Sequence, residues 1–246
     1  MLIGLCGQSC SGKDTVADYL IRNHSFVRVA FADPMKRFVQ DVFEFSDEQV
    51  WGPSGSRNAD DPRYIRQPHG CLGGTIDHFD EEGKAVVVDS PLHDVFLTPR
   101  YALQTLGTEW GRNCYSQVWV DYAIRIHKKL QEGHYGYEQK RGLYSVSFLA
   151  GQPEPMMVPK TNVVISDVRF LNEVIGIKNA GGFVFRVKRP GADGNVGIKG
   201  HASEEEQKAI HDDMLDGTIL NNRDIDHLYE VINRVVIPYL HVKERP

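Results

Sequence analysis

Short apolar runs alternate along the chain with longer stretches in which apolar residues recur every three or four positions. The runs cover residues 2–6, 27–31, 162–166, 183–187 and 218–221, and each is typical of a buried strand. Stretches with helical spacing cover residues 13–23, 33–45, 98–113, 117–130, 171–180, 203–211 and 225–236. Strands that alternate with helices form a mostly parallel sheet covered on both faces, with ligands at the carboxyl ends of the strands. The pattern predicts a three-layer α/β fold around a five-stranded parallel sheet.

Two longer segments interrupt this alternation. Residues 46–98 are rich in Gly, Pro, Asp and His, and residues 131–160 are rich in Gly, Tyr and Pro. Within the first segment, residues 75–79 and 85–88 predict a β-hairpin across the turn signal of residues 80–83. A chain of 246 residues can form one domain that carries such excursions. We therefore expect a single domain over residues 1–246 with insertions at 46–98 and 131–160.

The charge and the cysteines narrow the class of protein. Twenty-eight Lys and Arg against 33 Asp and Glu give a net charge of −5, and no basic tract stands out. This disfavours general nucleic-acid binding but leaves a small anionic substrate open. Four cysteines without a CxxC pair fit a reducing cytoplasm, and no apolar run approaches the ~20 residues of a membrane span. We expect a cytoplasmic protein without a membrane partner, and a homodimer stays open.

The clearest chemical signal lies between the first predicted strand and the first predicted helix. Residues 7–15 read GQSCSGKDT, which has the GxxxxGK spacing of a phosphate-binding loop. In such a loop, glycines let successive backbone amides turn toward phosphate oxygens, and the start of the helix adds a positive dipole end. The lysine then reaches the β- and γ-phosphates. The residues predicted to bind a polyphosphate are Gly7, Ser9, Ser11, Gly12, Lys13, Asp14 and Thr15.

Asp14 departs from the pattern of many phosphate loops, which carry at this position the Ser or Thr that ligates magnesium. Thr15 follows one position later, so direct magnesium ligation by this loop is not expected. Two roles stay open for Asp14. Its carboxylate could hold a metal-bound water, or its charge could simply stabilise the N-terminus of the helix.

A second polar segment, Asp167-Val168-Arg169, follows the predicted strand at residues 162–166. The carboxyl ends of parallel strands share one edge of the sheet, so this segment is expected on the same edge as the phosphate loop. The Asp167 carboxylate suits a magnesium ion bound through water. The Arg169 guanidinium can clamp an acceptor phosphate and neutralise charge in the transition state. A structural ion pair between the two is the alternative.

Taken together, seven segments resemble the deoxynucleoside monophosphate kinases of tailed phages, within the nucleoside monophosphate kinase group. They are SGKDT (11–15), FADPMK (31–36), RYALQTLGTEWGR (100–112), SDVR (166–169), VKRPG (187–191), HASE (201–204) and DGTILNN (216–222). The resemblance implies a P-loop kinase fold with an acceptor site built from helical insertions and a lid over residues 189–205. It also implies an enzyme that uses ATP and Mg²⁺ to phosphorylate a deoxynucleoside 5′-monophosphate to the diphosphate.

The resemblance also assigns roles to individual residues. Those implied for the acceptor nucleotide are Asp33, Lys36, Arg100, Gln104, Thr108 and Arg112, together with Arg169. Arg189 and Lys199 bound the implied lid, and Asn221 and Asn222 could present polar groups to the adenine. For each arginine, pairing with a local carboxylate or plain surface charge remains the alternative. The role of His201 stays open.

Other interpretations compete with this one. His69, Cys71, His78 and His93 raise the possibility of zinc, although their spacing matches no standard site. Arg57, Asn58 and Arg63 are candidates for shaping a base pocket within the first insertion. Two other functions remain open: a P-loop kinase acting on dephospho-coenzyme A or another small phosphorylated metabolite, and a nucleotide-binding regulator without turnover. The departure at Asp14 motivates the regulator.

Overall fold

The computed structural model describes residues 1–67, 75–79, 82, 85–88, 94–146, 159–191 and 209–240. The chain divides into two compact units, one formed by Met1–Pro34 with Gly111–Pro246 and the other by Met35–Trp110. Several sequence predictions lie outside the described residues, namely those on His69, Cys71, His93, Lys199 and His201, most of the implied lid, and most of the helix at 203–211. None of the described helices is long and apolar enough to cross a membrane.

The first unit is built on a five-stranded sheet in which every strand pairs in parallel with its neighbours. Its strands are β1 (Leu2–Cys6), β2 (Phe26–Arg28), β9 (Asn162–Val168), β10 (Phe183–Lys188) and β11 (Gly217–Leu220), in the order β11-β10-β1-β9-β2. The prediction of an α/β fold with a five-stranded parallel sheet is confirmed. Strand β2 is shorter than the predicted run at 27–31, because the chain turns after Val29 toward the next helix.

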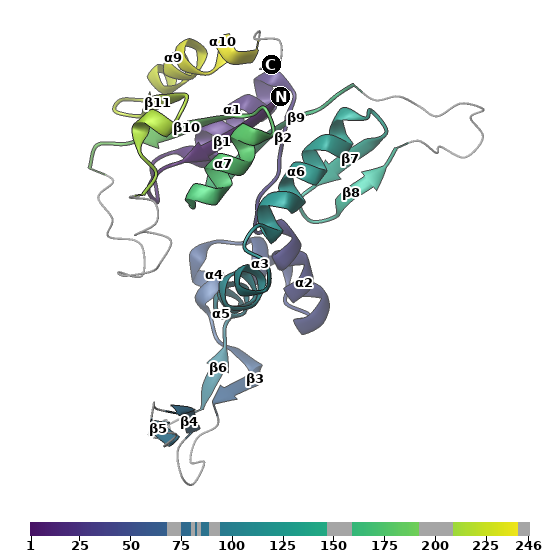
Figure 1. The fold of residues 1–246 in the computed structure, drawn as a ribbon, viewed down its shortest axis with the longest axis vertical. Coiled ribbons are helices and arrows are strands. Elements are labelled where there is room, and N and C mark those ends of the chain that lie inside the picture. Colours follow the sequence, from purple (N-terminus) through teal and green to yellow (C-terminus); the bar gives the residue numbers. More distant parts are fainter. Residues whose placement is uncertain are drawn as a thin grey trace, which may run out of the picture. The chain divides into compact units, whose positions relative to one another are not determined.

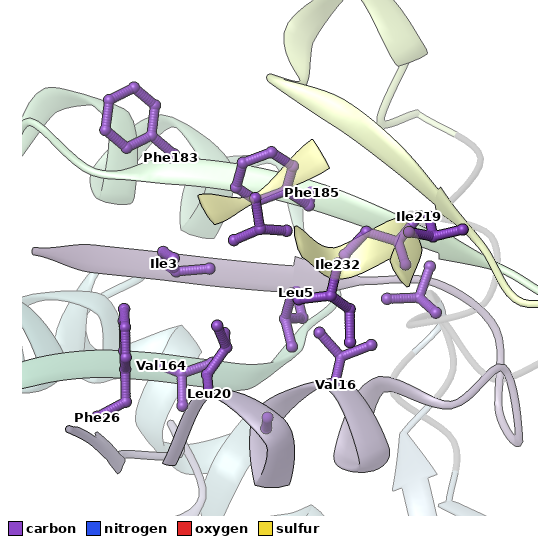
Figure 2. Close-up of a cluster of buried hydrophobic side chains, with 14 of the residues drawn as sticks. Ile3, Leu5, Val16, Leu20, Phe26, Val164, Phe183, Phe185, Ile219 and Ile232 are labelled. Carbon is purple, nitrogen blue, oxygen red and sulfur yellow. The ribbon is translucent and has the colours of Figure 1, made fainter. Parts of the chain in front are cut away.

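Helices cover both faces of this sheet (Figure 1). On one face, α1 (Lys13–His24) and α9 (Ile225–Val235) pack on the sheet, and the short α10 (Ile237–Leu240) follows α9. Figure 2 shows how Ile3 and Leu5 of β1 meet Val16 of α1 and Ile232 of α9 in a buried apolar cluster. Successive strand residues point to opposite faces, and Gly4 accordingly faces Ile177 of α7 (Leu171–Asn179). Helix α6 (Val118–Gln131) packs beside α7.

A β-hairpin within the predicted second insertion was not foreseen. It consists of β7 (Tyr135–Glu138) and β8 (Gly142–Ser145). The hairpin holds the Asp33 carboxylate, which is completely buried. The Tyr137 hydroxyl donates to Asp33 Oδ2 at 2.7 Å, the Gln139 amide donates to Asp33 Oδ1 at 3.1 Å, and the Ala30 backbone N–H donates to Oδ2 at 2.8 Å. These bonds fix the turn from which α2 starts.

The described part of the second unit carries short helices and two short antiparallel strand pairs, β3 with β6 and β4 with β5. Its elements are α2 (Asp33–Phe43, from Met35 on), α3 (Asp47–Trp51), α4 (Ser54–Asn58), β3 (Asp61–Gln67), β4 (Thr75–Phe79), β5 (Ala85–Val88), β6 (Val95–Leu97), α5 (Pro99–Gln104) and most of the π-helical η1 (Thr105–Arg112). The predicted hairpin of β4 and β5 is confirmed as an antiparallel pair. The predicted helix at 98–113 is only α-helical as far as Gln104, and η1 continues it with a wider turn. A small core includes Val39, Phe45 and Val50.

The hydrogen bond between Tyr137 and Asp33 should contribute measurably to stability. Replacing Tyr137 by Phe removes the hydroxyl and leaves a buried carboxylate oxygen with one donor fewer. We expect Tyr137→Phe to lower the free energy of unfolding in urea by about 1.5–3 kcal/mol, the range for hydrogen bonds to charged groups. Tyr144→Phe in the same hairpin is the matched control, because the Tyr144 ring lies under Arg141 and its hydroxyl bonds to none of the described residues. Equal effects of the two substitutions would contradict the assignment.

Candidate functional site

The loop between β1 and α1 is shaped by two glycines with positive φ. Gly7 has φ 137° and Gly12 has φ 103°. A Cβ atom on Gly7 would lie 2.4 Å from the carbonyl oxygen of Val187, and one on Gly12 would lie 2.5 Å from Nδ2 of Asn221. The Val187 backbone therefore excludes a side chain at Gly7, whereas at Gly12 the positive φ disfavours one beside the Asn221 side chain. The result is a tight turn at the N-terminus of α1, the geometry that directs backbone amides toward an anion.

Lys13 is folded over this loop. Its ammonium donates to the carbonyl oxygens of Gly7 at 2.8 Å and Gln8 at 2.6 Å. Burial lowers the pKa of Lys13, and the nearby charge of Arg169 lowers it further. Two cations thus lie close together at the carboxyl edge of the sheet. Their mutual repulsion makes the position between them favourable for an anion.

Asp167 and Arg169 come from the end of β9, beside β1. The pairing of β1 with β9 shifts register between Gly4 and Cys6, as in a β-bulge, at the point where these residues begin. The Asp167 carboxylate accepts hydrogen bonds from the backbone N–H groups of Phe31 at 3.2 Å and Ala32 at 3.3 Å. Asp167 therefore fixes the turn after β2. The Arg169 side chain is exposed, and no Asp167–Arg169 ion pair is found among the described residues.

Asp14 is engaged in an ion-pair network on the outside of the loop. Its carboxylate lies 3.3 Å from Nη1 of Arg28 and accepts from the Ser166 hydroxyl at 3.3 Å. Arg28 also pairs with Asp18 at 2.8 Å. Of the two roles left open for Asp14, this arrangement favours a charge at the start of α1 that links the helix to β2 and β9.

A carboxylate that the sequence analysis missed, Glu173, stands behind two of the predicted arginines. Its Oε1 accepts from Nη2 of Arg112 at 2.7 Å, and its Oε2 accepts from the backbone N–H groups of Arg169 at 2.7 Å and Phe170 at 3.0 Å. Burial raises the pKa of Glu173 to about 7, and the charge of Asp167 acts in the same direction. The hydrogen bond from the Arg169 amide and the Arg112 charge oppose this shift. The Arg112 guanidinium also lies over the Phe170 ring, 3.6 Å from its centroid.

One signal in the sequence could have identified Glu173. A Glu at the third position of α7 is typical of a capping box, in which its side chain accepts from the N-cap amide. The helical spacing of residues 171–180 predicts α7 but does not show what this Glu contacts. Its contact with Arg112 joins residues 61 positions apart, so it could not be read from local spacing.

The remaining predicted residues of the first unit lie around the same edge of the sheet. Asn221, rather than Asn222, touches the phosphate loop, since its Nδ2 donates to the Ser11 carbonyl oxygen at 3.0 Å. Asn222 is exposed beside it, and Arg189 is exposed directly after β10. The Ser11 hydroxyl is buried and has no hydrogen-bond partner among the described residues. Thr15 is half-buried on α1, and Ser9 is exposed on the loop.

Four of the residues predicted for the acceptor lie in the second unit. The Lys36 ammonium lies over the Trp51 ring, 4.5 Å from its centroid. Arg100 and Gln104 are half-buried on α5, and Thr108 is exposed on η1. The Arg100 Nε is buried without a hydrogen-bond partner among the described residues.

Arg57 and Arg63, which the sequence analysis considered for a base pocket, bond within the second unit. Arg57 donates to the Ser54 hydroxyl at 3.3 Å. Arg63 binds the buried Asp61 at 2.7 Å and holds the pKa of that carboxyl well below its usual range. The Arg63 guanidinium is thus tied to a local carboxylate, and Asn58 is exposed at the end of α4.

The residues of the loop fit a nucleotide polyphosphate. The cradle leaves no room for a Cβ at Gly7, Lys13 reaches over it, and the Ser11 hydroxyl, which has no partner among the described residues, lies within it. For a divalent cation the fit is more limited. Across the described ranges, no group of three or more His, Cys, Asp or Glu side chains could hold a metal ion. Magnesium usually keeps several waters and binds one or two carboxylates plus substrate phosphates, so Asp167 alone would suffice as a protein partner.

The close approach at Gly7 can be tested by substitution. Gly7→Ala adds a Cβ 2.4 Å from the Val187 carbonyl in addition to the strain of a positive φ. Gly181→Ala is the matched control, because Gly181 also has a positive φ but nothing lies within 4 Å of its Cβ position. We expect the control to lose about 1–2 kcal/mol in the free energy of unfolding, the cost of a left-handed non-glycine residue, and Gly7→Ala to lose more. Gly7→Ala alone should also weaken ATP binding in calorimetry. Unchanged ATP affinity would contradict the cradle geometry.

Comparison with known proteins gives an independent result. No protein-family model matches the chain. A protein of Acanthamoeba polyphaga mimivirus named "Putative deoxynucleotide monophosphate kinase" is 30% identical over 232 residues, which is 94% of this chain and 94% of that protein. This relative supports the wider group to which the resemblance pointed and gives no support to the narrower group of tailed phages. The chain belongs to the nucleoside monophosphate kinase family.

Proposed function

We propose that the protein transfers the γ-phosphoryl group of ATP to a deoxynucleoside 5′-monophosphate, forming ADP and a deoxynucleoside diphosphate. The observation that carries the proposal is the glycine cradle with Lys13 at the end of β1, beside Arg169 at the end of β9. The name of the mimivirus protein supports a deoxynucleotide as acceptor. The four cysteines without a CxxC pair support a cytoplasmic location for this activity.

The proposed reaction needs positioning and charge neutralisation more than proton transfer. The backbone amides of the loop and the Lys13 ammonium bind the phosphates of ATP. An oxygen of the acceptor phosphate attacks the γ-phosphorus in line, and the bond to the β-phosphate oxygen breaks. A phosphate monoester has its second pKa near ~6, so it is largely ionised at neutral pH and no general base is required. Arg169 neutralises charge on the transferred group.

Magnesium fits this scheme as a partner of the substrate. The Asp167 carboxylate would hold a Mg²⁺ ion through water while also accepting the Phe31 and Ala32 amides. The ion would supply positive charge to the phosphates of ATP. Asp14 is not needed for this role, because Arg28 and Ser166 engage its carboxylate.

The proposed acceptor residues fall into two classes. Direct binding of the acceptor, through the segments shared with the family, is proposed for Lys36, Arg100, Gln104, Thr108 and Arg112. Asp33 is proposed to act indirectly, because Tyr137, Gln139 and the Ala30 amide surround its buried carboxylate. We further propose that Asn222 meets the adenine and that Arg189 belongs to a lid that excludes water.

The first test is a panel of acceptors. ADP release from ATP and Mg²⁺ is measured with dAMP, dGMP, dCMP and dTMP, with their ribose counterparts, with dephospho-coenzyme A, and without acceptor. We expect turnover that depends on at least one deoxynucleotide. Turnover with dephospho-coenzyme A only would replace the proposed acceptor by another metabolite. ATP binding without turnover across the panel would favour a regulator.

The role of Lys13 is tested by Lys13→Ala. Removing the ammonium takes away a charge that stabilises the phosphates, so we expect kcat to fall by about 10²-fold or more while the thermal unfolding midpoint stays close to that of the wild type. Arg22→Ala is the control, because Arg22 is an exposed cation at the last turn of the same helix. Near-wild-type turnover of Lys13→Ala would refute the phosphate-loop mechanism.

A further inference from the structure

A single buried carboxylate connects Arg112 and Arg169, the two arginines of the first unit that the family resemblance implies for the acceptor nucleotide. We propose that Glu173 is a positioning residue for the acceptor phosphate: it sets the Arg112 guanidinium and the backbone that carries Arg169 in one fixed arrangement. This inference rests on the proposed function and goes beyond it, since neither the family segments nor the relative assigns a role to Glu173.

The geometry uses both oxygens of the carboxylate. Oε1 binds Arg112, and Oε2 accepts two backbone N–H groups, those of Arg169 and Phe170. The Glu173 residue is 1% exposed, so these bonds form in a site that water does not reach. A displacement of the carboxylate would therefore move the guanidinium of Arg112 and the start of the Arg169 segment together.

The Arg112 guanidinium is held along one edge and against one face, and its other N–H donors are available for a ligand. Nη2 is bound to Glu173, and the ring of Phe170 supports the guanidinium plane at 3.6 Å. Arg112 makes no further hydrogen bond to the described residues. A guanidinium carries five N–H donors in a rigid fork, and such a fork matches the oxygens of a phosphate. The fixed orientation lets Arg112 bind a phosphate without losing conformational freedom at that moment.

A helix cap alone does not require a charged side chain at the position of Glu173. The capping box of α3 in the second unit uses a neutral side chain, Gln49, which accepts from the Ser46 amide at 2.8 Å. At α7 the same position carries a buried carboxyl group, whose charged form is costly to desolvate unless a cation and hydrogen bonds compensate for it. Arg112 supplies the cation. A charge kept at this cost indicates that the position of Arg112 matters, and not only the start of α7.

A purely structural ion pair is the competing explanation, and Asp216 provides the control for it. The Asp216 side chain is 5% exposed, accepts from the Val184 backbone N–H at 2.8 Å and lies 3.7 Å from Lys178. It is thus another buried, paired carboxylate, placed at the amino ends of β10 and β11, the opposite edge from the phosphate loop. Its loss should reduce stability without affecting substrate binding.

The experiment compares Glu173→Gln, Arg112→Lys, the double variant and Asp216→Asn in the full chain. Glutamine cannot serve both sets of donors, and lysine keeps the charge but lacks the fork. We expect both single variants to raise the KM of the acceptor by about tenfold or more with a smaller change in the KM of ATP. If Glu173 acts through Arg112, the double variant is no worse than the more impaired single variant. Asp216→Asn should lower the unfolding midpoint and leave both KM values unchanged.

The outcomes separate this inference from the proposed function. Absence of turnover by the wild type across the acceptor panel would remove the proposed function, whatever the variants do. With an active wild type, additive losses in the double variant would overturn the positioning role of Glu173. The role would also be overturned if Glu173→Gln and Asp216→Asn both raised the acceptor KM in proportion to their loss of stability. If Glu173→Gln does not fold, Arg112→Lys decides, because an unchanged acceptor KM in that variant excludes the role.

Discussion

The burial of β1 on both faces is the constraint on which the rest of the first unit depends. All five residues of this strand are buried, and its two edges pair with β9 and β10, which lie more than 150 positions later in the chain. A strand enclosed in this way returns to solvent only at its end, after Cys6. The phosphate loop, the Asp167 segment and Arg189 follow parallel strands and therefore reach the same edge of the sheet. The site is thus a consequence of strand order.

Three carboxylates hold the backbone in place at this edge of the sheet. Asp33, Asp167 and Glu173 each accept backbone N–H groups from segments that leave the sheet or begin a helix. Such amides have no partner within a helix or strand, and a carboxylate satisfies them more strongly than a neutral acceptor does. These three carboxylates therefore serve the backbone, and the positive charges of Lys13 and Arg169 are left to meet a ligand.

Local patterns predicted the elements well, and contacts distant in sequence account for what they missed. The strands at residues 2–6 and 162–166, the phosphate loop and the first helix depend on hydrophobic spacing and glycines, which can be read directly. The role of Asp33 could not be read, because Tyr137 reaches it from 104 positions away. The strands of the β7–β8 hairpin are only four residues long, too short for a clear alternation. The π-helical η1 has apolar residues at positions that a regular helix would also use.

Lys13 and Arg112 differ in how the protein holds them, and this difference suggests how each would bind a substrate phosphate. Lys13 donates to two carbonyl groups of its own loop, so it can exchange these bonds for phosphate oxygens without leaving an unpaired charge. Arg112 is fixed by Glu173 and Phe170 and would change little on binding. A flexible cation suits the phosphates of ATP, whose charges shift during transfer, whereas a rigid fork suits the acceptor phosphate, whose orientation decides whether attack is in line. Under the proposed function, Glu173 would act through this geometry, although it would touch neither substrate.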